Sequence, residues 1–467
     1  DPPDGYAAYT DVHSQIDYEI MREFTRNFDG GSTFFYIDED GKLVMGPLWD
    51  YNMAMGNANY AHNDEPGYSV TGWNDSYMAP GVNGWCPWWY RFRDDPDYQQ
   101  RFIDRWFALR QGILSDTNVL ADILAAASLL NAEAAARSFQ RWAVLGRYVW
   151  ANPPGWQERD TYQSEVDWMG GWLLDRAAWI DEQFVEPPQI TTDKRTSAGE
   201  VLVTLACGDN ATEIYYTLDG SDPRIFGRSE GEASTTGNDN GSSRGDISPS
   251  AVKYSLAEPI RIDQEVVIKA RVLCPGNPYS LWSGLAVKRC RVGIDESDLQ
   301  ITEIMYHPVD VDPCDSIPRQ DYEFLEITNA GSAPIKLDGL RFTEGIRFSF
   351  PGMELGQDEF IVLAKNPVAL HSRYGVLLMD ATVLGPYRGH LSNGGERLRW
   401  EGPEGTIQDF SYGDSWCPLT DGHDFSLTVI RRHSVDPQEW SLRRMWRVST
   451  TPGGSPGWDD VPTLGLP

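Results

Sequence analysis

Two acidic turns near the start of the chain carry the residue types best suited to chemistry. One turn holds Asn27 and Asp29, and the other holds Asp50 and Asn52 at the end of a predicted hairpin. Phosphoryl transfer needs one group that orients the acceptor hydroxyl and another that holds a metal ion on the nucleotide phosphates. Two carboxylate-bearing turns joined by a short hairpin therefore predict one turn for each task.

Ordinary structural roles are the alternative for these residues. Asp is favoured in turns and at helix caps, so Asp29 and Asp50 could serve the backbone geometry alone. Trp49, beside the second turn, is predicted to lie in the core rather than on a ligand. The aromatic cluster at 85–90 is likewise predicted to pack against helices, with stacking on a sugar or a base as the alternative.

Helical patterns dominate residues 1–187 and position these turns. Ile16, Ile20 and Phe24 recur at every fourth position, which predicts an amphipathic helix before the first turn. A stiff linker is predicted at Glu186-Pro187-Pro188. Further helices are predicted around residues 102–109, 119–130 and 166–184, and the hairpin over 36–42.

A period of two replaces the helical pattern after residue 188. Residues 226–250 are rich in Gly, Ser, Asn and Asp and predict a long loop, whose adhesion tripeptide Arg244-Gly245-Asp246 we interpret as a chance occurrence. Residues 451–457 are predicted to be unstructured. Strands are predicted over 201–205, 213–218, 266–272, 301–306, 324–329 and 359–364.

The alternation of patterns predicts a multidomain α+β protein. A mostly helical lobe with a β-hairpin comes first, and two β-sandwich domains of the Ig-like type follow. A chain of 467 residues is long enough for about three cores. We expect domains over 1–187, 188–296 and 297–458, with a tail over 459–467.

Composition restricts the possible partners. The net charge of −30 argues against nucleic acid, because a phosphate backbone requires a basic surface. No apolar run reaches membrane-spanning length, so we expect no membrane span. The acidic balance is typical of a secreted protein, with solubility alone as the alternative explanation.

The cysteines permit disulfides and argue against a zinc site. The sequence has six of them without a CxxC pair, and none of its seven histidines stands at metal-binding spacing. The pairings to test first are Cys207 with Cys274 and Cys314 with Cys417, which leaves Cys86 and Cys290 unassigned.

Three strings resemble known families. A helix that ends at Asn27-Phe28-Asp29, the hairpin and the string Gly46 to Asn52 make residues 1–185 similar to the C-terminal part of the CotH (spore-coat kinase) family. Residues 200–292 resemble a chitobiase-type C-terminal β-sandwich module through the string Ile214 to Pro223. Residues 298–458 resemble a lamin-tail-type Ig-like domain, through Ile301 to Met305, Glu323 to Asn329 and Thr451-Pro452-Gly453.

The CotH resemblance implies transfer of the ATP γ-phosphate to protein hydroxyls outside the cytoplasm, with Mg²⁺ as the divalent metal. By motif position, Asp50 matches the metal-binding Asp, and Asn52 stands where a second Asp is usual. Asp29, with Asn27 beside it, matches the acidic turn that orients the acceptor hydroxyl. The family's N-terminal lobe with its phosphate-gripping Lys has no counterpart here, and Lys42 is a poor substitute. We therefore expect ATP binding to need an upstream segment of the same precursor.

A non-catalytic function is the alternative. The chain would then be a cell-surface or extracellular-matrix protein for structure or adhesion, with a degenerate kinase-like lobe and two β-sandwiches as binding or assembly modules. Either function places the protein outside the cell or on its surface. Its expected partner is a protein substrate in the first case and a surface or matrix component in the second.

Overall fold

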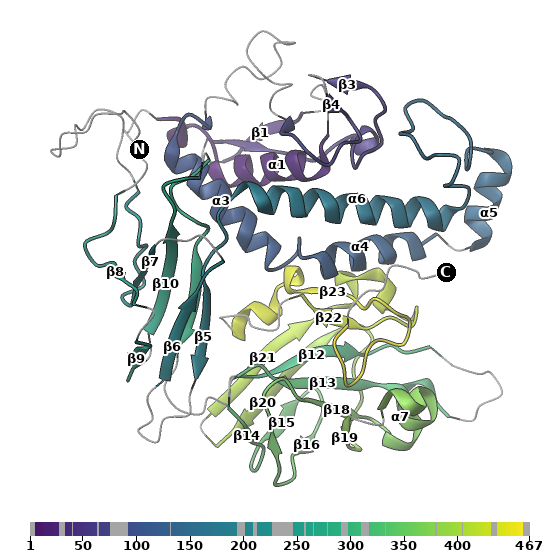
Figure 1. Ribbon diagram of the computed structural model, residues 1–467. Coiled ribbons are helices and arrows are strands. Elements are labelled where there is room, and N and C mark those ends of the chain that lie inside the picture. The colour runs from purple at the N-terminus through teal and green to yellow at the C-terminus, as the bar shows by residue number, and fades with distance from the viewer. Residues whose placement is uncertain are drawn as a thin grey trace.

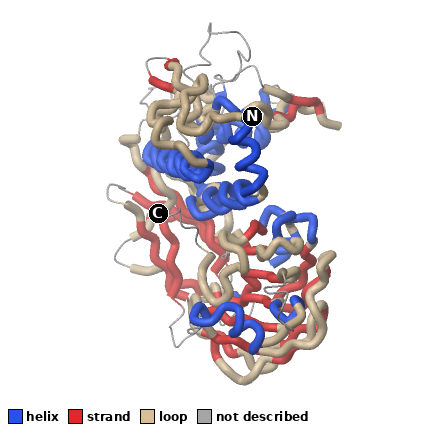
Figure 2. The backbone as a smooth tube through the Cα atoms, turned by 90° about the vertical axis from the view of Figure 1, so that its right-hand side faces the viewer, coloured by secondary structure: helices blue, strands red, loops and turns tan. Residues whose placement is uncertain are grey.

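A layer of helices lies across two groups of β-sheets (Figures 1 and 2). We call residues 5–183 the helical region, 189–290 the first β-region and 299–460 the second β-region. This computed structural model describes residues 5–27, 33–39, 41–62, 65–74, 92–130, 132–193, 201–208, 213–226, 246–255, 258–264, 266–277, 279–290, 298–309, 317–331, 333–378, 381–403, 405–430 and 437–460.

The helical region contains every helix that the sequence predicts. Asp11 caps the first helix by accepting a hydrogen bond from the Ser14 N–H at 2.7 Å, and Thr161 forms a capping box with Ser164 at the last. The helices are α1 (Val12–Thr25), α3 (Pro96–Arg110), α4 (Asp116–Ser128), α5 (Ala132–Arg141) and α6 (Tyr162–Gln183). The strand pairs are β1 (Phe35–Ile37) with β2 (Leu43–Met45), and β3 (Ala61–His62) with β4 (Glu65–Pro66).

The core of this region lies between α1, α3 and α6. The predicted stripe of Ile16, Ile20 and Phe24 is confirmed, since none of the three is more than 4% exposed. Phe24 contacts Trp106 of α3 with ring centroids 6.1 Å apart. Burial of large side chains of this kind stabilises a fold by about 1.5–3 kcal/mol each, so packing rather than helix propensity holds α1 in place.

The first β-region consists of two sheets that face a shared core. Val201, Val203 and Leu205 alternate with more exposed residues and point into that core. The sheet orders are β5-β6-β9 and β11-β10-β7-β8. The strands are β5 (Gln189–Asp193), β6 (Val201–Ala206), β7 (Glu213–Thr217), β8 (Val252–Lys253), β9 (Ile260–Ile262), β10 (Val266–Leu273) and β11 (Ala286–Cys290).

The predicted pairing of Cys207 with Cys274 is wrong. Both are free thiols, and so are Cys290 and Cys417. Cys207 follows β6 and Cys274 follows β10, and these strands belong to different sheets. Proximity to strand ends, on which the prediction rested, does not bring the two sulfur atoms together. Cys86 and Cys314 lie outside the described residues, as do the 85–90 cluster and residues 227–245.

The second β-region stacks a six-stranded sheet against a four-stranded sheet. Their orders are β19-β18-β13-β12-β22-β23 and β16-β15-β20-β21, and β14 pairs with β17. The elements are β12 (Leu299–Met305), β13 (Phe324–Asn329), β14 (Ile335–Lys336), β15 (Arg341–Glu344), β16 (Phe348–Ser349), β17 (Glu354–Leu355), β18 (Phe360–Ala364), α7 (Pro367–Tyr374), β19 (Thr382–Leu384), β20 (Glu396–Gly402), β21 (Gly405–Tyr412), β22 (Leu427–Val429) and β23 (Trp446–Val448).

Strand β12 is buried on both of its faces. Its pairing with β13 shifts register between Ile301 and Glu303, so Ile301 and Ile304 both reach the core between the sheets. Met305 points to the other face, where Leu370 of α7 covers it. The polar residues of this strand are therefore buried as well, and Thr302 donates to Glu326 at 2.7 Å.

The segment after β23 is ordered, contrary to the prediction for residues 451–457. The Ser455 backbone N–H and hydroxyl both donate to Glu303, each at 2.9 Å, and the Gly457 N–H donates to Glu326 at 2.8 Å. Gly454 has a φ of +77°, and a Cβ there would lie 2.1 Å from Glu303 Oε1. Its glycines therefore permit close docking on buried carboxylates rather than mark disorder.

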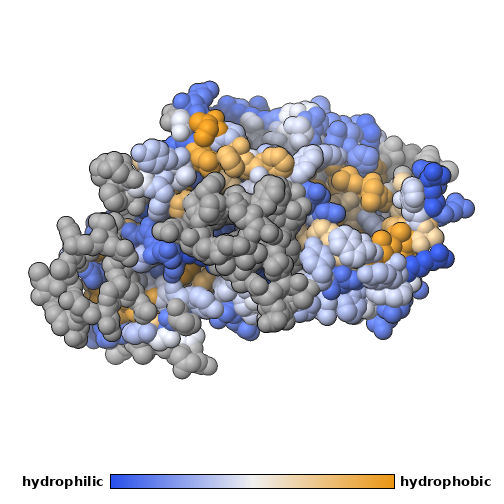
Figure 3. All heavy atoms as spheres, turned by 90° about the horizontal axis from the view of Figure 1, so that it is seen from above, coloured by the Kyte–Doolittle hydropathy of each residue, from blue (hydrophilic) through white to orange (hydrophobic). Residues whose placement is uncertain are grey.

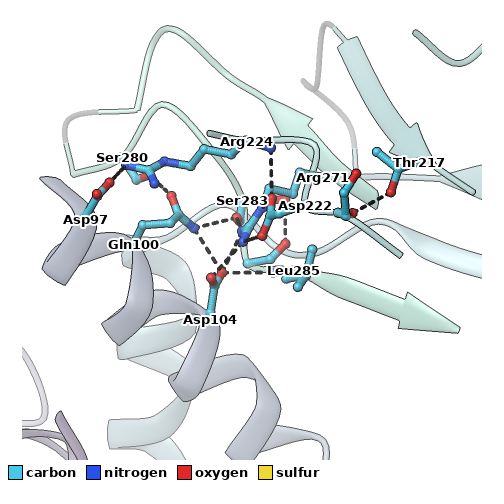
Figure 4. Close-up of polar contacts among 12 residues, drawn as sticks. Asp97, Gln100, Asp104, Thr217, Asp222, Arg224, Arg271, Ser280, Ser283 and Leu285 are labelled. Atoms are coloured by element: carbon cyan, nitrogen blue, oxygen red, sulfur yellow. Dashed lines mark hydrogen bonds and ion pairs between the residues drawn. The ribbon is translucent and has the colours of Figure 1, made fainter. Parts of the chain in front are cut away.

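Helix α3 joins the helical region to the first β-region through buried ion pairs (Figure 4). Arg271 of β10 is fully buried and donates to Asp104 of α3 at 2.6 and 2.7 Å. It also donates to Asp222 at 2.7 and 2.6 Å. Arg224 pairs with Asp97 at 2.6 Å. These bidentate contacts fix the orientation of the first β-region on α3.

Helix α4 joins the helical region to the second β-region, which lies beneath it with β23 nearest (Figure 1). Arg447 of β23 is buried and donates through Nε to Asn118 of α4 at 2.6 Å. Its other guanidinium nitrogens bind Asp460. Asp460 is therefore held beside α4.

No single helix in the described ranges has both the length and the apolar character to cross a membrane. Helices α4 and α5 meet that test only as a pair bent by 76°.

Candidate functional site

The end of α1 and the segment after β2 meet at the predicted site. The Met55 N–H donates to the Thr25 carbonyl at 2.6 Å, and Asn27 is 2% exposed. Burial raises the pKa of the Tyr51 phenol, and neighbouring Tyr18, Arg22 and Asn27 also act on it. The structure therefore brings Asn27 and the turn that contains Asp50 and Asn52 together. Asp29 lies outside the described residues.

The second turn presents its polar side chains to solvent. Asp50 has φ 59° and ψ 58°, the left-handed conformation that Asp tolerates better than most side chains. Asp50 and Asn52 are both exposed. The Asn57 amide donates to the Asn52 carbonyl at 2.8 Å and closes the turn. The turn can therefore offer the Asp50 carboxylate and the Asn52 amide oxygen to a ligand.

A buried network of charged and polar residues supports the first turn at Asn27. Glu23 of α1 accepts from Arg176 of α6 at 3.3 Å and from the Asn74 N–H at 2.8 Å. Arg176 is fully buried and also donates to the Glu23 carbonyl at 2.9 Å. The Asn74 amide donates to the Asn27 carbonyl at 2.6 Å. The backbone of Asn27 is thus fixed by residues from three parts of the chain.

The sequence interpretation missed this network. Its only signal is that Glu19 and Glu23 lie on the same face of α1 as Ile16 and Ile20, where the helical period predicts burial. Buried carboxylates require partners. Arg93 binds Glu19 at 2.5 Å and Glu23 at 3.3 Å. Which residues pair with Glu19 and Glu23 depends on the fold and could not be predicted from the helical pattern.

Gly56 lets the segment after the second turn approach α6. Its φ is +78°, and a Cβ there would lie 2.7 Å from atoms of both Trp168 and Trp172. No other residue type fits this contact without displacing an indole ring. The glycine therefore holds the turn against the helical core.

The donor set at the turn fits a magnesium ion only if phosphate oxygens complete its shell. Among the described residues no three His, Cys, Asp or Glu side chains gather into a metal site. Mg²⁺ in nucleotide sites uses one or two carboxylates together with phosphate oxygens and water. The exposed carboxylate of Asp50 and the amide of Asn52 satisfy that smaller requirement.

The hairpin beside the turn is apolar and exposed, which corrects the prediction for Trp49. Trp49 is 60% exposed and contacts Phe34, with ring centroids 6.3 Å apart. Trp49 is exposed to solvent together with the rest of the segment over 47–50. Seen from above, the described surface has apolar side chains at more than one place (Figure 3). The exposed apolar residues here are Phe34, Phe35, Tyr36, Ile37, Leu48 and Trp49.

A groove with a volume of about 880 Å³ opens on the other side of the turn. Residues of the segment over 51–57, Tyr51 and Asn52 among them, line one part of it, and α4 with Leu130 beyond it, α5, α6 and the loop over 142–160 supply the rest. Most of its lining is apolar. The candidate turn therefore lies between an exposed apolar hairpin and an apolar groove.

Two models of protein families match parts of the chain. Residues 1–180 match the family model described as CotH kinase protein. We call these residues the CotH segment. Residues 203–281 match the model described as Fn3 associated, which supports an accessory module in the first β-region. The chitobiase-type and lamin-tail-type resemblances stay predictions.

Other comparisons add little about the CotH segment or the β-regions. No curated protein matches the chain. One solved structure, a DUF4876 family protein from Bacteroides thetaiotaomicron, is 16% identical over 25% of this chain and 41% of its own, with a TM-score of 0.14. A similarity this low carries no argument about the fold.

Proposed function

We propose that the CotH segment is the C-terminal part of a secreted atypical protein kinase domain, which transfers the ATP γ-phosphate to protein hydroxyls. The observation that carries the proposal is the position of Asp50 within the matched segment. It lies exposed on a turn that the buried Asn27 supports. The two β-regions act as accessory modules, and an upstream segment of the same precursor completes the nucleotide site.

Each site residue has a role in this proposal. Asp50, assisted by the Asn52 amide oxygen, holds Mg²⁺, and the ion neutralises charge on the phosphates of ATP when it is bound. Asp29, with Asn27 beside it, orients the acceptor hydroxyl. Asn52 supplies an oxygen without a charge, so we expect weaker metal binding than a second carboxylate would give.

The test is phosphotransfer from γ-labelled ATP to casein, measured with Mg²⁺ and with the purified precursor that includes the upstream segment. Asp50→Asn keeps the left-handed turn but removes the charge, and we expect it to reduce transfer at least a hundredfold. Asp358→Asn is the matched control, because Asp358 is also exposed and has a φ of 56°. Equal transfer by the Asp50→Asn and Asp358→Asn variants would remove Asp50 from the proposal.

A non-catalytic binding function is the second candidate. The exposed apolar face of the β1–β2 hairpin favours it, since exposed patches of this kind mark interaction surfaces. In that case a cell-surface or matrix protein covers the hairpin. Tyr36→Lys with Ile37→Lys would then abolish attachment to isolated cell walls or matrix, while the Asp50→Asn variant would attach as the original chain does.

A further inference from the structure

The groove of about 880 Å³ is lined by apolar side chains that nothing in the described residues covers. On α4 its wall consists of Ile123, Ala126 and Ala127, and Leu130 continues it beyond the helix. Leu130 is 54% exposed, so the groove is open along this side. An apolar wall of this extent on a surface indicates a binding site for another apolar group.

The ionic groups of the groove leave little to attract a charged ligand. Arg159 donates to Glu165 at 2.9 Å and lies 4.5 Å over the Trp168 ring. Its remaining nitrogens donate to the carbonyls of Pro153 and Pro154. The remaining acid of the lining, Asp122, is exposed, and the charges of Arg447 and Arg443 act on it. The fitting occupant is therefore uncharged and aliphatic.

The chain itself supplies such a segment next to the groove. Residues 461–467 read Val-Pro-Thr-Leu-Gly-Leu-Pro and carry no charged side chain. They follow Asp460, which Arg447 holds beside Asn118 of α4. Asn118 lies one helical turn before Asp122, so the segment starts at the mouth of the groove.

Length also fits. Seven residues span at most about 23–25 Å when extended. The stretch of α4 from Asp122 to Leu130 covers about 12 Å at 1.5 Å per residue. Proline fixes φ at positions 462 and 467, which lowers the entropy that the segment loses on binding.

We propose that residues 461–467 bind in this groove as an intramolecular ligand, with Val461, Leu464 and Leu466 against the apolar wall. Tyr51 and Asn52 line the same groove, so the segment would lie beside the candidate nucleotide turn. The proposal concerns binding alone and holds whether or not the CotH segment is catalytic.

The first test removes residues 461–467 and adds them back as a fluorescein-labelled peptide. The shortened chain should bind the peptide, and the full chain should bind it at least tenfold more weakly, because a tethered segment competes at millimolar effective concentration. Equal binding by the two chains, or no binding by the shortened one, would overturn the proposal.

Two exposed positions of α4 provide matched variants. Ala126 lines the groove, whereas Ser128 lies on the same helix outside the lining. In the shortened chain, Ala126→Glu should weaken peptide binding at least tenfold, and Ser128→Glu should change it less than twofold. Equal effects would place the peptide elsewhere.

Photo-crosslinking in the full chain locates the segment without relying on the truncation. A benzophenone side chain at position 464 should crosslink within the same molecule to α4, α5, α6, the loop over 142–160 or residues 51–57. Crosslinks to a second copy, to an added protein or to any other element would contradict the proposal.

Discussion

Buried carboxylates are the most unusual single residues of this protein. Glu323, which is 1% exposed, accepts hydrogen bonds from the Leu391 N–H at 2.7 Å and the Tyr387 hydroxyl at 3.0 Å. Burial nevertheless raises the pKa of Glu323 to about 7, with Glu396 raising it and Lys365 lowering it. Burial also raises the pKa of Glu303. The second β-region therefore holds two carboxyl groups whose pKa lies above the ordinary value for Glu.

This predicts that the second β-region loses stability as the pH rises from about 4.5 to about 7. Within that window the folded state keeps a proton on Glu323 that the unfolded chain has lost. Below the window the contribution is fully present, and above it the contribution is lost. At about 1.4 kcal/mol per pKa unit, Glu323 alone accounts for roughly 3 kcal/mol.

Urea unfolding of the full chain at several pH values checks this expectation. Glu323→Gln should flatten the pH dependence, because the amide does not titrate. Glu359→Gln, which changes an exposed glutamate of the same region, should leave the slope intact. A Glu323→Gln chain with the original slope would assign the effect to other groups.

At the scale of elements, periodicity predicted most of the helices and strands, because it is a local property of the sequence. Ile16, Ile20 and Phe24 are buried as expected, and Val201 to Leu205 form a strand. The contacts between elements could not be predicted. Arg271 and Asp104 are 167 residues apart in the chain, and no local pattern shows that they meet. The same limit explains the error about Cys207 and Cys274, and why the supports of Asn27 were missed.

The α3 ion pairs predict that Asp104→Asn weakens the attachment of the first β-region by about 3 kcal/mol. The change leaves Arg271 fully buried with only one carboxylate, Asp222. Asp17→Asn is the control, because Asp17 and Arg105 form an exposed pair of similar length, and such pairs contribute about 0–1 kcal/mol.

Hydrogen exchange of the β10 amides measures this attachment. Exchange should accelerate more than tenfold in the Asp104→Asn variant and remain unchanged in the Asp17→Asn variant. Similar rates in both variants would show that the buried pair does not hold the first β-region in place.

At the scale of the whole molecule, the helical region is a frame that holds both β-regions through separate helices. α3 binds the first β-region through Asp104, and α4 binds the second through Asn118. The candidate turn lies on neither of these contacts. The β-regions can therefore position the CotH segment or bind partners without blocking Asp50, which agrees with accessory roles.

The most direct test of the central claim is calorimetric titration of the precursor, with its upstream segment, with ATP in the presence and absence of Mg²⁺. The account predicts Mg²⁺-dependent binding that Asp50→Asn weakens at least tenfold and Asp358→Asn leaves unchanged. Binding of equal strength in the Asp50→Asn variant, or no binding by the unmutated precursor, would contradict the assignment of a metal–nucleotide site to this turn.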